Sequence, residues 1–521
     1  MHMHTKVIVT NWSALKAKYS GSLGAISEAI RALIAADRQR GVRTRFVRLD
    51  HHGDMGALGA PPVLDPTDPQ ENKDAIDAVC DAMSSQDPMS PHYVMLLGSN
   101  DVIPHQDLTN PLAAHDGEPH AWSDLPYACK ADYGHDIDDF TAPERVVGRL
   151  PDLTGGRDAS YLLGVLHVAA TWRPHPRSDY APYFALSAKR WEESTTTSLE
   201  ATFGSAQHML LSPPHGPHWS DAQIAPRSHF INCHGFAGRS YYHGHADAVG
   251  APALTGALVE GRLTEGTVAS VECCFGAELF EPASVDGQMS VCNTYLASGA
   301  YAFFGSTNTS YGPDSGNGQA DLIARFFLRE VLEGASVGHA ALEARLRLAG
   351  MWADPGPHTR KTLAQFVLLG DPSIHAVQPA HAAKTVPAGA AAKLGAAHLD
   401  LLAGRDERRR ELRVRAQALA ESTRPVVKAR SYRLSPPVRR TLKDLARQAG
   451  MAMDTLETFR VHPPRGREYR KAAALPAATR EALHILSRDD APEGAPARKP
   501  ALLIAKEVGG RIVSYTTLRA K

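Results

Sequence analysis

The residues best suited to chemistry are one imidazole and two adjacent thiols, each at the end of an apolar run. The run HFINCH ends in His234, and the run ASVECC ends in Cys273 and Cys274. A free thiol has a pKa of about 8.5, so little of it is thiolate at neutral pH unless an imidazole or oriented backbone N–H groups stabilise the anion. The pattern therefore indicates nucleophilic catalysis by a cysteine with the help of a histidine.

Glycines follow both reactive segments. Gly235 comes directly after His234, and Gly276 closes the segment CCFG. Without a β-carbon a glycine lets a substrate backbone come close, and its N–H group can point at a developing oxyanion. The two segments thus combine groups that can attack a carbonyl with groups that can stabilise the result.

The two adjacent cysteines are not expected to act as one unit. Neighbouring residues on an extended strand point to opposite faces, which disfavours joint ligation of a metal, and a disulfide between them would be strained. Cysteine is also among the most buried residue types, so one of the pair is expected to be an inert core residue. The 25 histidines are spread through the chain without Cys-x-x-Cys pairs, so neither a metal nor a cofactor is predicted.

Strand-like runs and helical patterns alternate along the first 378 residues, which predicts an α/β fold with a mostly parallel sheet. The clearest βαβ pattern joins strand-like runs at 5–10 and 43–50 through a helical pattern at 20–41. Residues 1–155 are predicted as an N-terminal α/β subdomain and residues 156–378 as a second, catalytic subdomain. Further strand-like runs lie at 93–104, 144–151, 183–189, 208–213, 229–235, 267–274 and 299–307.

The runs 229–235 and 267–274 carry the reactive residues at their carboxyl ends. In an open α/β sheet, functional groups collect where the parallel strands end and loops leave the core. If these two strands are neighbours, the imidazole and a thiol share one edge of the sheet, with the thiol at the exposed end of its strand.

The remainder of the chain differs in composition. Residues 379–399 are rich in Ala and Pro and are predicted to be a linker. Residues 400–521 are predicted to be a small basic α+β domain, because 14 Lys/Arg stand against 5 Asp/Glu between 401 and 447 and a β-hairpin pattern surrounds Gly509-Gly510 near the end. The basic run is interpreted either as a solvated helix face or as a docking surface for an acidic partner or nucleic acid.

The charge balance, the apolar runs and the cysteine count of the chain argue against several classes of protein. Among 521 residues, 56 Lys/Arg equal 56 Asp/Glu, so no general attraction to nucleic acid or to an anionic membrane is expected. The first residues lack the pattern of a secretory signal, and no apolar run is long enough to span a membrane. Six cysteines are too few for a disulfide scaffold, which together with the missing signal predicts a cytoplasmic protein with free thiols.

Four segments resemble a known family when taken together and in order. INCHG, ECCFGAELF, SGAYAFFGSTNTSYG and FVLLGDPSIHAV are similar to gingipain-type cysteine peptidases, in the wider group with caspases, legumains, clostripain and separase. The resemblance extends over residues 90–378 and includes SDLPYA and VVGRLPD. It implies a caspase-like (caspase-hemoglobinase) fold and a catalytic His-Cys dyad.

The resemblance identifies His234 as the dyad histidine, which helps to activate the thiol and protonates the leaving amine. Relatives with an acidic residue two places before the nucleophile select Cys274, since Glu272 stands there. Relatives with Cys-x-x-Gly select Cys273 instead, with Gly276 as the glycine. We favour Cys274, because the residues after it resemble the start of a helix that follows the family's nucleophile, and we keep Cys273 as the alternative.

Further site residues also follow only from the resemblance. The backbone N–H groups of Gly235 and Cys274 are implied to form the oxyanion hole. Tyr311 stands near the aromatic that walls the pocket for the residue before the scissile bond, and Asp314 is the nearest acid that could bind Arg or Lys. The helical segment SYLLGVLHVAA lacks the acid expected of arginine-specific members, so a basic preference is not predicted.

The resulting hypothesis is an intracellular cysteine endopeptidase that cleaves a protein partner, in a bacterial defence or regulated cell-death system. A regulatory protein partner is expected to act through residues 400–521, whereas binding of nucleic acid is not expected. The alternative is a catalytically silent caspase-like scaffold that binds protein or nucleic acid through its basic C-terminal region.

Overall fold

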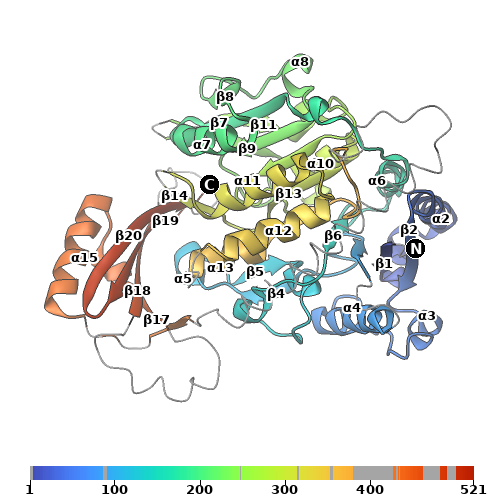
Figure 1. Ribbon diagram of the computed structural model, residues 1–521, viewed down its shortest axis with the longest axis horizontal. Coiled ribbons are helices and arrows are strands. Elements are labelled where there is room, and N and C mark those ends of the chain that lie inside the picture. The colour runs from blue at the N-terminus through green and yellow to red at the C-terminus, as the bar shows by residue number, and fades with distance from the viewer. Residues whose placement is uncertain are drawn as a thin grey trace.

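A computed structural model describes most of the chain and places its main body around one large sheet (Figure 1). The sheet has ten strands in the order β2-β1-β3-β6-β15-β13-β12-β9-β7-β8. The described residues are 4–85, 91–246, 248–313, 316–351, 356–378, 426–429, 432, 434–461, 481–489 and 500–520.

The first half of the sheet contains the βαβ unit predicted at the start of the chain. Strand β1 (His4–Thr10) pairs in parallel with β2 (Val42–Arg48) and β3 (Tyr93–Leu97), and β3 pairs in parallel with β6 (Val147–Leu150). Strand β1 is buried along its whole length, as expected for a strand in a parallel sheet that is covered on both faces. The helices of this half are α1 (Trp12–Tyr19), α2 (Leu23–Gln39), α3 (His52–Gly56) and α4 (Pro69–Ser84).

The second half carries the reactive residues. Its five strands are mutually parallel: β7 (Tyr183–Ala188), β8 (Met209–Ser212), β9 (Ser228–Asn232), β12 (Val268–Val271) and β13 (Ala302–Ser306). Strand β15 (Phe366–Leu369) joins the halves, because it is parallel to β6 and antiparallel to β13. The two expected subdomains therefore share one continuous sheet, and their strands run in opposite directions.

Helices cover both faces of the sheet. One hydrophobic cluster joins the sheet to residues of α2, α4, α6 (Ser160–Thr171) and α10 (Val291–Ala297). A second cluster joins it to α7 (Glu192–Phe203), α11 (Gln319–Leu332) and α12 (Val337–Ala349). This arrangement confirms the predicted α/β class with a mostly parallel central sheet.

Short elements lie around the edges of the sheet. Hairpin β4 (Gln106–Thr109) and β5 (His120–Ser123) and hairpin β10 (Tyr241–His245) and β11 (Val249–Thr255) are separate two-stranded sheets. The short helices are α5 (Ala113–Asp116), α8 (Asp221–Ile224), α9 (Gly256–Val259) and α13 (Pro357–Gln365).

The C-terminal part forms a second, antiparallel sheet with one helix, α15 (Pro436–Ala449), as Figure 1 shows at the left. Its strands are β16 (Val426–Lys428), β17 (Glu457–Val461), β18 (Glu481–Asp489), β19 (Pro500–Val508) and β20 (Arg511–Ala520). Gly509 and Gly510 both have positive φ in the turn between β19 and β20, so the predicted hairpin is confirmed. The predicted linker 379–399 and the densest basic run, 404–417, lie outside the described residues.

The sixth strand of this sheet comes from the main body. Strand β14 (Tyr311–Pro313) follows β13 and pairs antiparallel with the end of β20, so the two sheets meet directly beside the reactive edge. No helix within the described ranges is long and apolar enough to cross a membrane.

Candidate active site

The two segments with reactive residues end on neighbouring strands, as predicted. Strands β9 and β12 pair in parallel, with Ile231 beside Val271, so His234 and the two cysteines leave the sheet at the same edge. The backbone N–H of Glu272 continues the ladder by donating to the carbonyl of Ile231 at 2.9 Å. The sheet therefore brings together the two segments that the sequence singles out.

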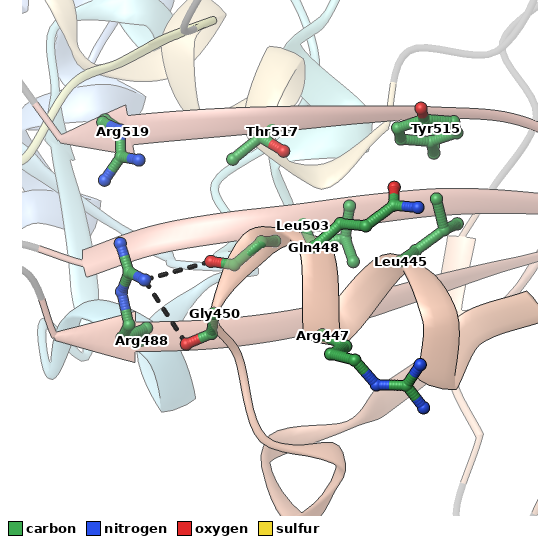
Figure 2. A pocket seen from close by; sticks show the side chains of 10 residues that line it. Leu445, Arg447, Gln448, Gly450, Arg488, Leu503, Tyr515, Thr517 and Arg519 are labelled. Atoms are coloured by element: carbon green, nitrogen blue, oxygen red, sulfur yellow. Dashed lines mark hydrogen bonds between the residues drawn. The ribbon is translucent and has the colours of Figure 1, made fainter.

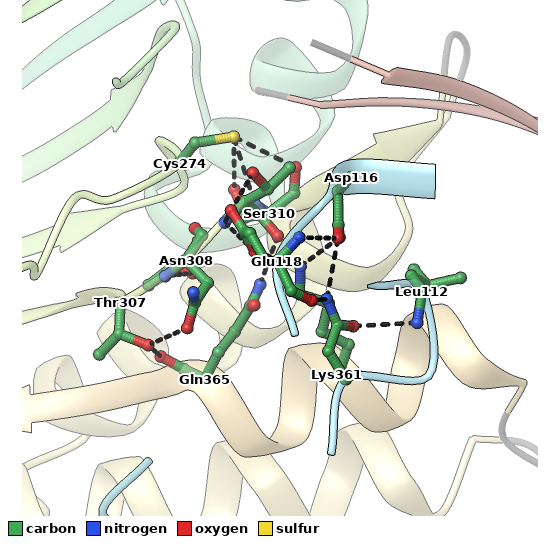
Figure 3. Close-up of polar contacts among 12 residues, drawn as sticks. Leu112, Asp116, Glu118, Cys274, Thr307, Asn308, Ser310, Lys361 and Gln365 are labelled. Atoms are coloured by element: carbon green, nitrogen blue, oxygen red, sulfur yellow. Dashed lines mark hydrogen bonds and ion pairs between the residues drawn. The ribbon is translucent and has the colours of Figure 1, made fainter. Parts of the chain in front are cut away.

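The two thiols point in different directions, as predicted, although both lie just after the end of β12. Cys273 Sγ accepts a hydrogen bond from the backbone N–H of Cys233 at 3.3 Å and belongs to the main hydrophobic core. Burial there, with the nearby thiol of Cys233, raises its pKa well above the ordinary value. Cys274 Sγ instead accepts from the backbone N–H of Ser310 at 3.2 Å, on the side of β13 and β14 (Figure 3).

Cys274 differs from the prediction in two ways. We expected it at the exposed end of its strand, but it is fully buried, in a cluster that includes Tyr311 and apolar residues of the C-terminal sheet. We also expected a helix to begin after it, but Phe275 has a φ of 55° and residues 273–277 form a turn. Both expectations were wrong, because neither the turn nor the covering sheet can be read from the local pattern.

His234 is held by a hairpin and by an aromatic side chain. Its backbone exchanges two hydrogen bonds with His243 of β10, at 3.0 and 2.8 Å. Its imidazole Nε2 lies 2.7 Å from Nδ1 of His245, and its ring centroid lies 4.6 Å from that of Trp191. The sequence analysis missed Trp191 and His245, although the alternating histidines of YYHGH beside the dyad segment were a signal that could have found the second.

The imidazole and the thiols are near each other in the sheet but are not bonded. Across the described residues, no hydrogen bond joins Cys273 or Cys274 to the ring of His234. In the strand order β13-β12-β9-β7, Cys274 bonds toward the β13 side, while His234 contacts Trp191, which follows β7. The structure thus shows a thiol and an imidazole on one edge that face opposite flanks of it.

The glycine after His234 lies against the backbone of Cys274. A β-carbon at Gly235 would come within 1.8 Å of the carbonyl oxygen of Cys274, so no other residue fits without a shift of the backbone. The two residues implied to form an oxyanion hole are therefore adjacent. Gly276 has a different part, because its N–H already donates to the carbonyl of Cys273 at 3.1 Å and closes the turn.

Tyr311 does not wall an open pocket in this structure. It is fully buried, and its hydroxyl donates to Asp116 at 3.1 Å. Lys361 bridges Asp116 and Glu118 (Figure 3). Its Nζ lies 5.6 Å from the Tyr311 ring centroid. Burial, with the carboxylates of Asp116 and Glu118, raises the pKa of Tyr311 well above its usual value. The other residue predicted for this pocket, Asp314, lies outside the described residues.

Glu278 is an acid close to the site that the sequence analysis passed over. Its carboxylate accepts a hydrogen bond from the backbone N–H of Gly238 at 2.7 Å, which ties the loop after His234 to the segment after Cys274. Burial raises the pKa of Glu278 to about 7, and the nearby Glu118 adds to this shift. Glu278 therefore changes charge near neutral pH.

A groove with basic residues lies on the C-terminal sheet (Figure 2). Arg488 donates to the backbone carbonyls of Ala449 and Gly450, at 3.0 and 3.3 Å, and so caps the end of α15. Arg447 and Arg519 also line the groove. This groove is separate from the edge with the thiols. In the part of the chain that the structure describes, no group of three or more His, Cys, Asp or Glu side chains is arranged to hold a metal ion.

Comparison with known proteins gives one family match. Residues 243–377 match the model of peptidase family C25, the gingipain family, and this match supports a cysteine-type peptidase. The matched range contains both Cys273 and Cys274, while His234 lies nine residues before it. No curated protein matches the chain.

Three solved structures are similar over nearly the whole chain. A chain described as "Structure of Protease" is 13% identical, with a TM-score of 0.48, covering 99% of this chain and 97% of its own. The Arg-specific cysteine proteinase gingipain R (RgpB) is 12% identical, with a TM-score of 0.46 and coverage of 99% and 97%. The complex of the Porphyromonas gingivalis RgpB pro- and mature domains is 11% identical, with a TM-score of 0.44 and coverage of 99% of both chains.

Proposed function

Because the segment with both thiols is similar to cysteine peptidase family C25, we propose that the protein is a cysteine endopeptidase that uses His234 and Cys274 as a catalytic dyad. The observation that carries this proposal is the family match across the thiol segment. The pairing of β9 with β12 adds support, since it puts the imidazole and the thiol segment at one sheet edge. A protein or peptide is the substrate.

The positions of the two thiols support Cys274 rather than Cys273 as the nucleophile. The backbone N–H of Ser310 holds Cys274 Sγ on the flank that faces β14 and the C-terminal sheet. Cys273 is part of the core between sheet and helices, where burial raises its pKa and disfavours the thiolate. Cys274 lies between the main body and the C-terminal sheet, so it can be uncovered without unfolding that core.

The proposed reaction needs the thiol and the imidazole to turn toward each other from the positions described above. His234 then takes the thiol proton, and the thiolate attacks the substrate carbonyl carbon as the carbonyl electron pair moves to oxygen. The backbone N–H groups of Gly235 and Cys274 donate to this oxyanion. Its collapse breaks the C–N bond, and His234 returns the proton to the leaving amine. A water deprotonated by His234 hydrolyses the thioester and restores the thiol.

The setting of the enzyme is part of the proposal as well. We propose a cytoplasmic location, supported by six cysteines that are all free thiols. We propose a regulatory protein partner that acts through residues 400–521, supported by the contact of the C-terminal sheet with β14. A role in bacterial defence or regulated cell death is supported only by the Ala- and Arg-rich composition and by this additional C-terminal part.

A peptide-library cleavage profile tests the proposal directly. The wild type is compared with Cys274→Ala, Cys273→Ala and His234→Ala, with Cys292→Ala as a buried-thiol control outside the dyad. Loss of cleavage in Cys274→Ala and His234→Ala, with activity kept in Cys273→Ala and Cys292→Ala, is the expected result. Cleavage at the wild-type rate by both Cys274→Ala and Cys273→Ala would exclude a cysteine peptidase.

A further inference from the structure

The imidazole of His234 has a close partner on the hairpin beside it. Nε2 of His234 lies 2.7 Å from Nδ1 of His245, a normal hydrogen-bond distance, and the two ring centroids are 4.9 Å apart. The backbone pairing of His234 with His243 holds β10 against the end of β9, and Trp191 packs near both rings. His245 is therefore placed by the fold and not by a loose surface contact.

This hydrogen bond couples the tautomer of His234 to that of His245. A neutral imidazole carries one N–H, so one ring nitrogen of the pair must donate and the other must accept. When His245 accepts, the proton of His234 sits on Nε2, and Nδ1 is the nitrogen that can take the thiol proton. When His245 is protonated, it donates to Nε2, and the proton of His234 is forced onto Nδ1, where it blocks base catalysis.

We propose that His245 is a positioning residue for the dyad, which keeps His234 in the tautomer that accepts the proton of Cys274. The proposal rests on the proposed function of His234. It makes the resting charge of His245 a condition for catalysis: activity is lost at low pH when His245 gains a proton. His245 does not touch the substrate in this account, and it acts only through His234.

Among the described residues, charged or titratable groups occur on two elements beside His245. Lys189 and Arg190 belong to the short 3-10 helix Lys189–Trp191 that packs against β10, and both are positive. His243 stands two residues before His245 on β10, and its Nδ1 lies 2.6 Å from the carbonyl oxygen of Gly250. The described parts of the neighbouring strands β7, β8 and β11 carry no ionisable side chain other than Tyr183.

Replacement of His245 by Asn and by Ala separates positioning from simple packing. The amide oxygen of Asn stands close to the place of Nδ1 and accepts a hydrogen bond, but it does not titrate. His245→Asn is expected to keep cleavage within about fivefold of wild type at pH 8, while His245→Ala lowers kcat by about 10- to 100-fold with little change in KM. The acid limb of the kcat/KM profile moves to lower pH in His245→Asn by about half a pH unit, because one proton-binding group of the pair is gone.

A second readout does not depend on peptidase activity. Two-bond ¹H–¹⁵N spectra of the full chain with labelled histidine report which nitrogen of His234 carries the proton. The Nε2–H tautomer is expected in wild type and in His245→Asn, and His208→Asn, which removes an exposed imidazole elsewhere, leaves it unchanged. Equal cleavage and equal pH profiles in His245→Asn and His245→Ala, or an Nδ1–H tautomer in wild type, would overturn the proposal. If the wild type cleaves no peptide, but His245→Ala still loses the Nε2–H tautomer of His234, the proposed function is rejected and the positioning role is kept.

A different observation concerns the cover over Cys274. Strand β14 begins one residue after Ser310, whose N–H holds Cys274 Sγ, and β20 pairs with all three residues of β14. The partners are Tyr311 with Ala520, Gly312 with Arg519, and Pro313 with Leu518. An extended peptide uses the same backbone groups when it adds to the edge of a sheet.

Side chains of the main body and of the C-terminal sheet also pack together beside β14 and β20. Cys274, Tyr311 and Leu112 of the main body share one hydrophobic cluster with residues of the C-terminal sheet. Glu457 at the start of β17 lies 3.2 Å from His115 of α5. The members from the C-terminal sheet are Phe459, Leu483, Ile485, Leu502, Ile504 and Leu518.

We infer that the C-terminal sheet is a built-in cover, which holds the peptidase closed until β20 leaves β14. This inference rests on Cys274 as the proposed nucleophile. The cover both buries the thiol and occupies a strand edge beside it, so a peptide substrate and the C-terminal sheet cannot use the site together. A partner that removes β20 from β14 would then act as an activator.

Two side chains of β20 make a matched pair for the test. Leu518 is buried in the shared cluster, whereas Tyr515 on the same strand is 58% exposed. In the full chain, Leu518→Asp is expected to raise the rate of Cys274 alkylation by iodoacetamide at least about tenfold, since a buried charge opens the junction, and Tyr515→Asp leaves the rate unchanged. Peptide mapping by mass spectrometry measures the modification at Cys274, with Cys273 as the internal control that stays protected.

A crosslink tests the cover without weakening the fold. Gly312→Cys combined with Arg519→Cys places two thiols on paired residues of β14 and β20. The oxidised double variant is expected to alkylate and cleave more slowly than its reduced form, while Gly312→Cys alone shows no such difference. An unchanged alkylation rate in Leu518→Asp together with no effect of the crosslink would overturn the cover. Faster alkylation without any cleavage would keep the cover and reject the peptidase.

Discussion

The two halves of the ten-stranded sheet use buried polar residues in opposite ways. In the first half, charged groups are fully paired: Lys6 contacts Asp37 at 2.6 Å and Asp371 at 2.7 Å, with none of the three side chains exposed by more than 1%. In the second half, a thiol and two imidazoles lie near the strand ends: Cys274 Sγ accepts from the backbone N–H of Ser310, and His234 Nε2 lies 2.7 Å from His245 Nδ1. Closed ion networks hold a fold in place, whereas thiols and imidazoles are the side chains suited to exchanging a proton during a reaction.

A second network of the first half shows the same difference. Arg149 donates to both oxygens of Asp124 and to the carbonyls of Gly98, Ser99 and Ile103. Burial alone would raise the pKa of Asp124, but Arg149 and His105 outweigh it and hold that pKa below the ordinary value. His105 bonds to Asp124 at 2.9 Å, and its burial lowers its own pKa and keeps it neutral. A histidine beside a carboxylate is thus structural here, while His234 beside a histidine is proposed to be catalytic.

The largest expected effect is the loss of the proposed nucleophile in the second half of the sheet. Cys274→Ala is expected to lower kcat/KM by about 10³-fold or more, since no other group of the edge replaces the nucleophile. Cys273→Ala removes only a core sulfur and is expected to keep kcat/KM within about threefold while it lowers the free energy of unfolding by about 1 kcal/mol. Steady-state cleavage and urea unfolding of both variants separate the two roles. If Cys273→Ala loses more activity than Cys274→Ala, Cys273 is the nucleophile and Cys274 is the core residue.

The next largest effect is the loss of the buried ion network in the first half of the sheet. Arg149→Met leaves Asp124 buried without its main partner, and the free energy of unfolding is expected to fall by about 3–5 kcal/mol. Where the variant still folds, kcat/KM per folded molecule is expected to stay near wild type, because Arg149 lies in the other half of the sheet. Denaturant unfolding and active-site titration measure the two quantities. A specific loss of kcat with unchanged stability would show that the first half takes part in catalysis.

A smaller effect is the pH dependence of the free energy of unfolding, which Glu278 in the second half contributes. Glu278 has a pKa raised to about 7, against about 4.3 in an unfolded chain, so the fold favours its protonated form. The wild type therefore loses stability as pH rises through this interval, and Glu278→Gln does not. Glu278→Gln is expected to be about 3–4 kcal/mol more stable than wild type at pH 8 and equal to it near pH 4. Thermal unfolding across this pH range checks the sign, and a Glu278→Gln that is less stable at pH 8 would contradict it.

The smallest effect concerns the C-terminal sheet. Arg488→Ala removes two hydrogen bonds to the last turn of α15 and is expected to cost about 1 kcal/mol in the stability of this sheet. If the sheet is the cover over Cys274, the same variant raises the alkylation rate of Cys274 by a few-fold. Hydrogen exchange of β18 and β19 measures the loss of stability. Faster exchange with no change at Cys274 would separate the stability of the sheet from the closure of the site.

Local pattern predicted the parts of the fold that depend on local sequence. The βαβ unit, the strand ends at His234 and Cys274, and the hairpin at Gly509-Gly510 all follow from periodicity and turn residues. The position of β15 does not, because the pairing of Leu369 with Arg149 joins residues far apart in the chain. Strand order of this kind is set by packing of the whole molecule, which periodicity does not report.

The site was predictable to a similar degree. The type and spacing of residues identified the imidazole and the thiols. The two thiols were expected to point apart, and they do, although they lie in the turn after β12 and not on the strand. The contact of His245 with His234 was missed because it depends on how hairpin β10–β11 folds back on β9. The burial of Cys274 was missed because it depends on a sheet formed by residues more than 150 positions later.

The most direct test of the dyad is covalent labelling of the full chain with a library of peptidyl acyloxymethyl ketones, followed by peptide mapping. Such a reagent alkylates a nucleophilic cysteine that it reaches as a substrate does. The account predicts one modified residue, Cys274, and loss of the modification in His234→Ala. Labelling at Cys273, or labelling at Cys274 that proceeds equally well without the imidazole of His234, would contradict it.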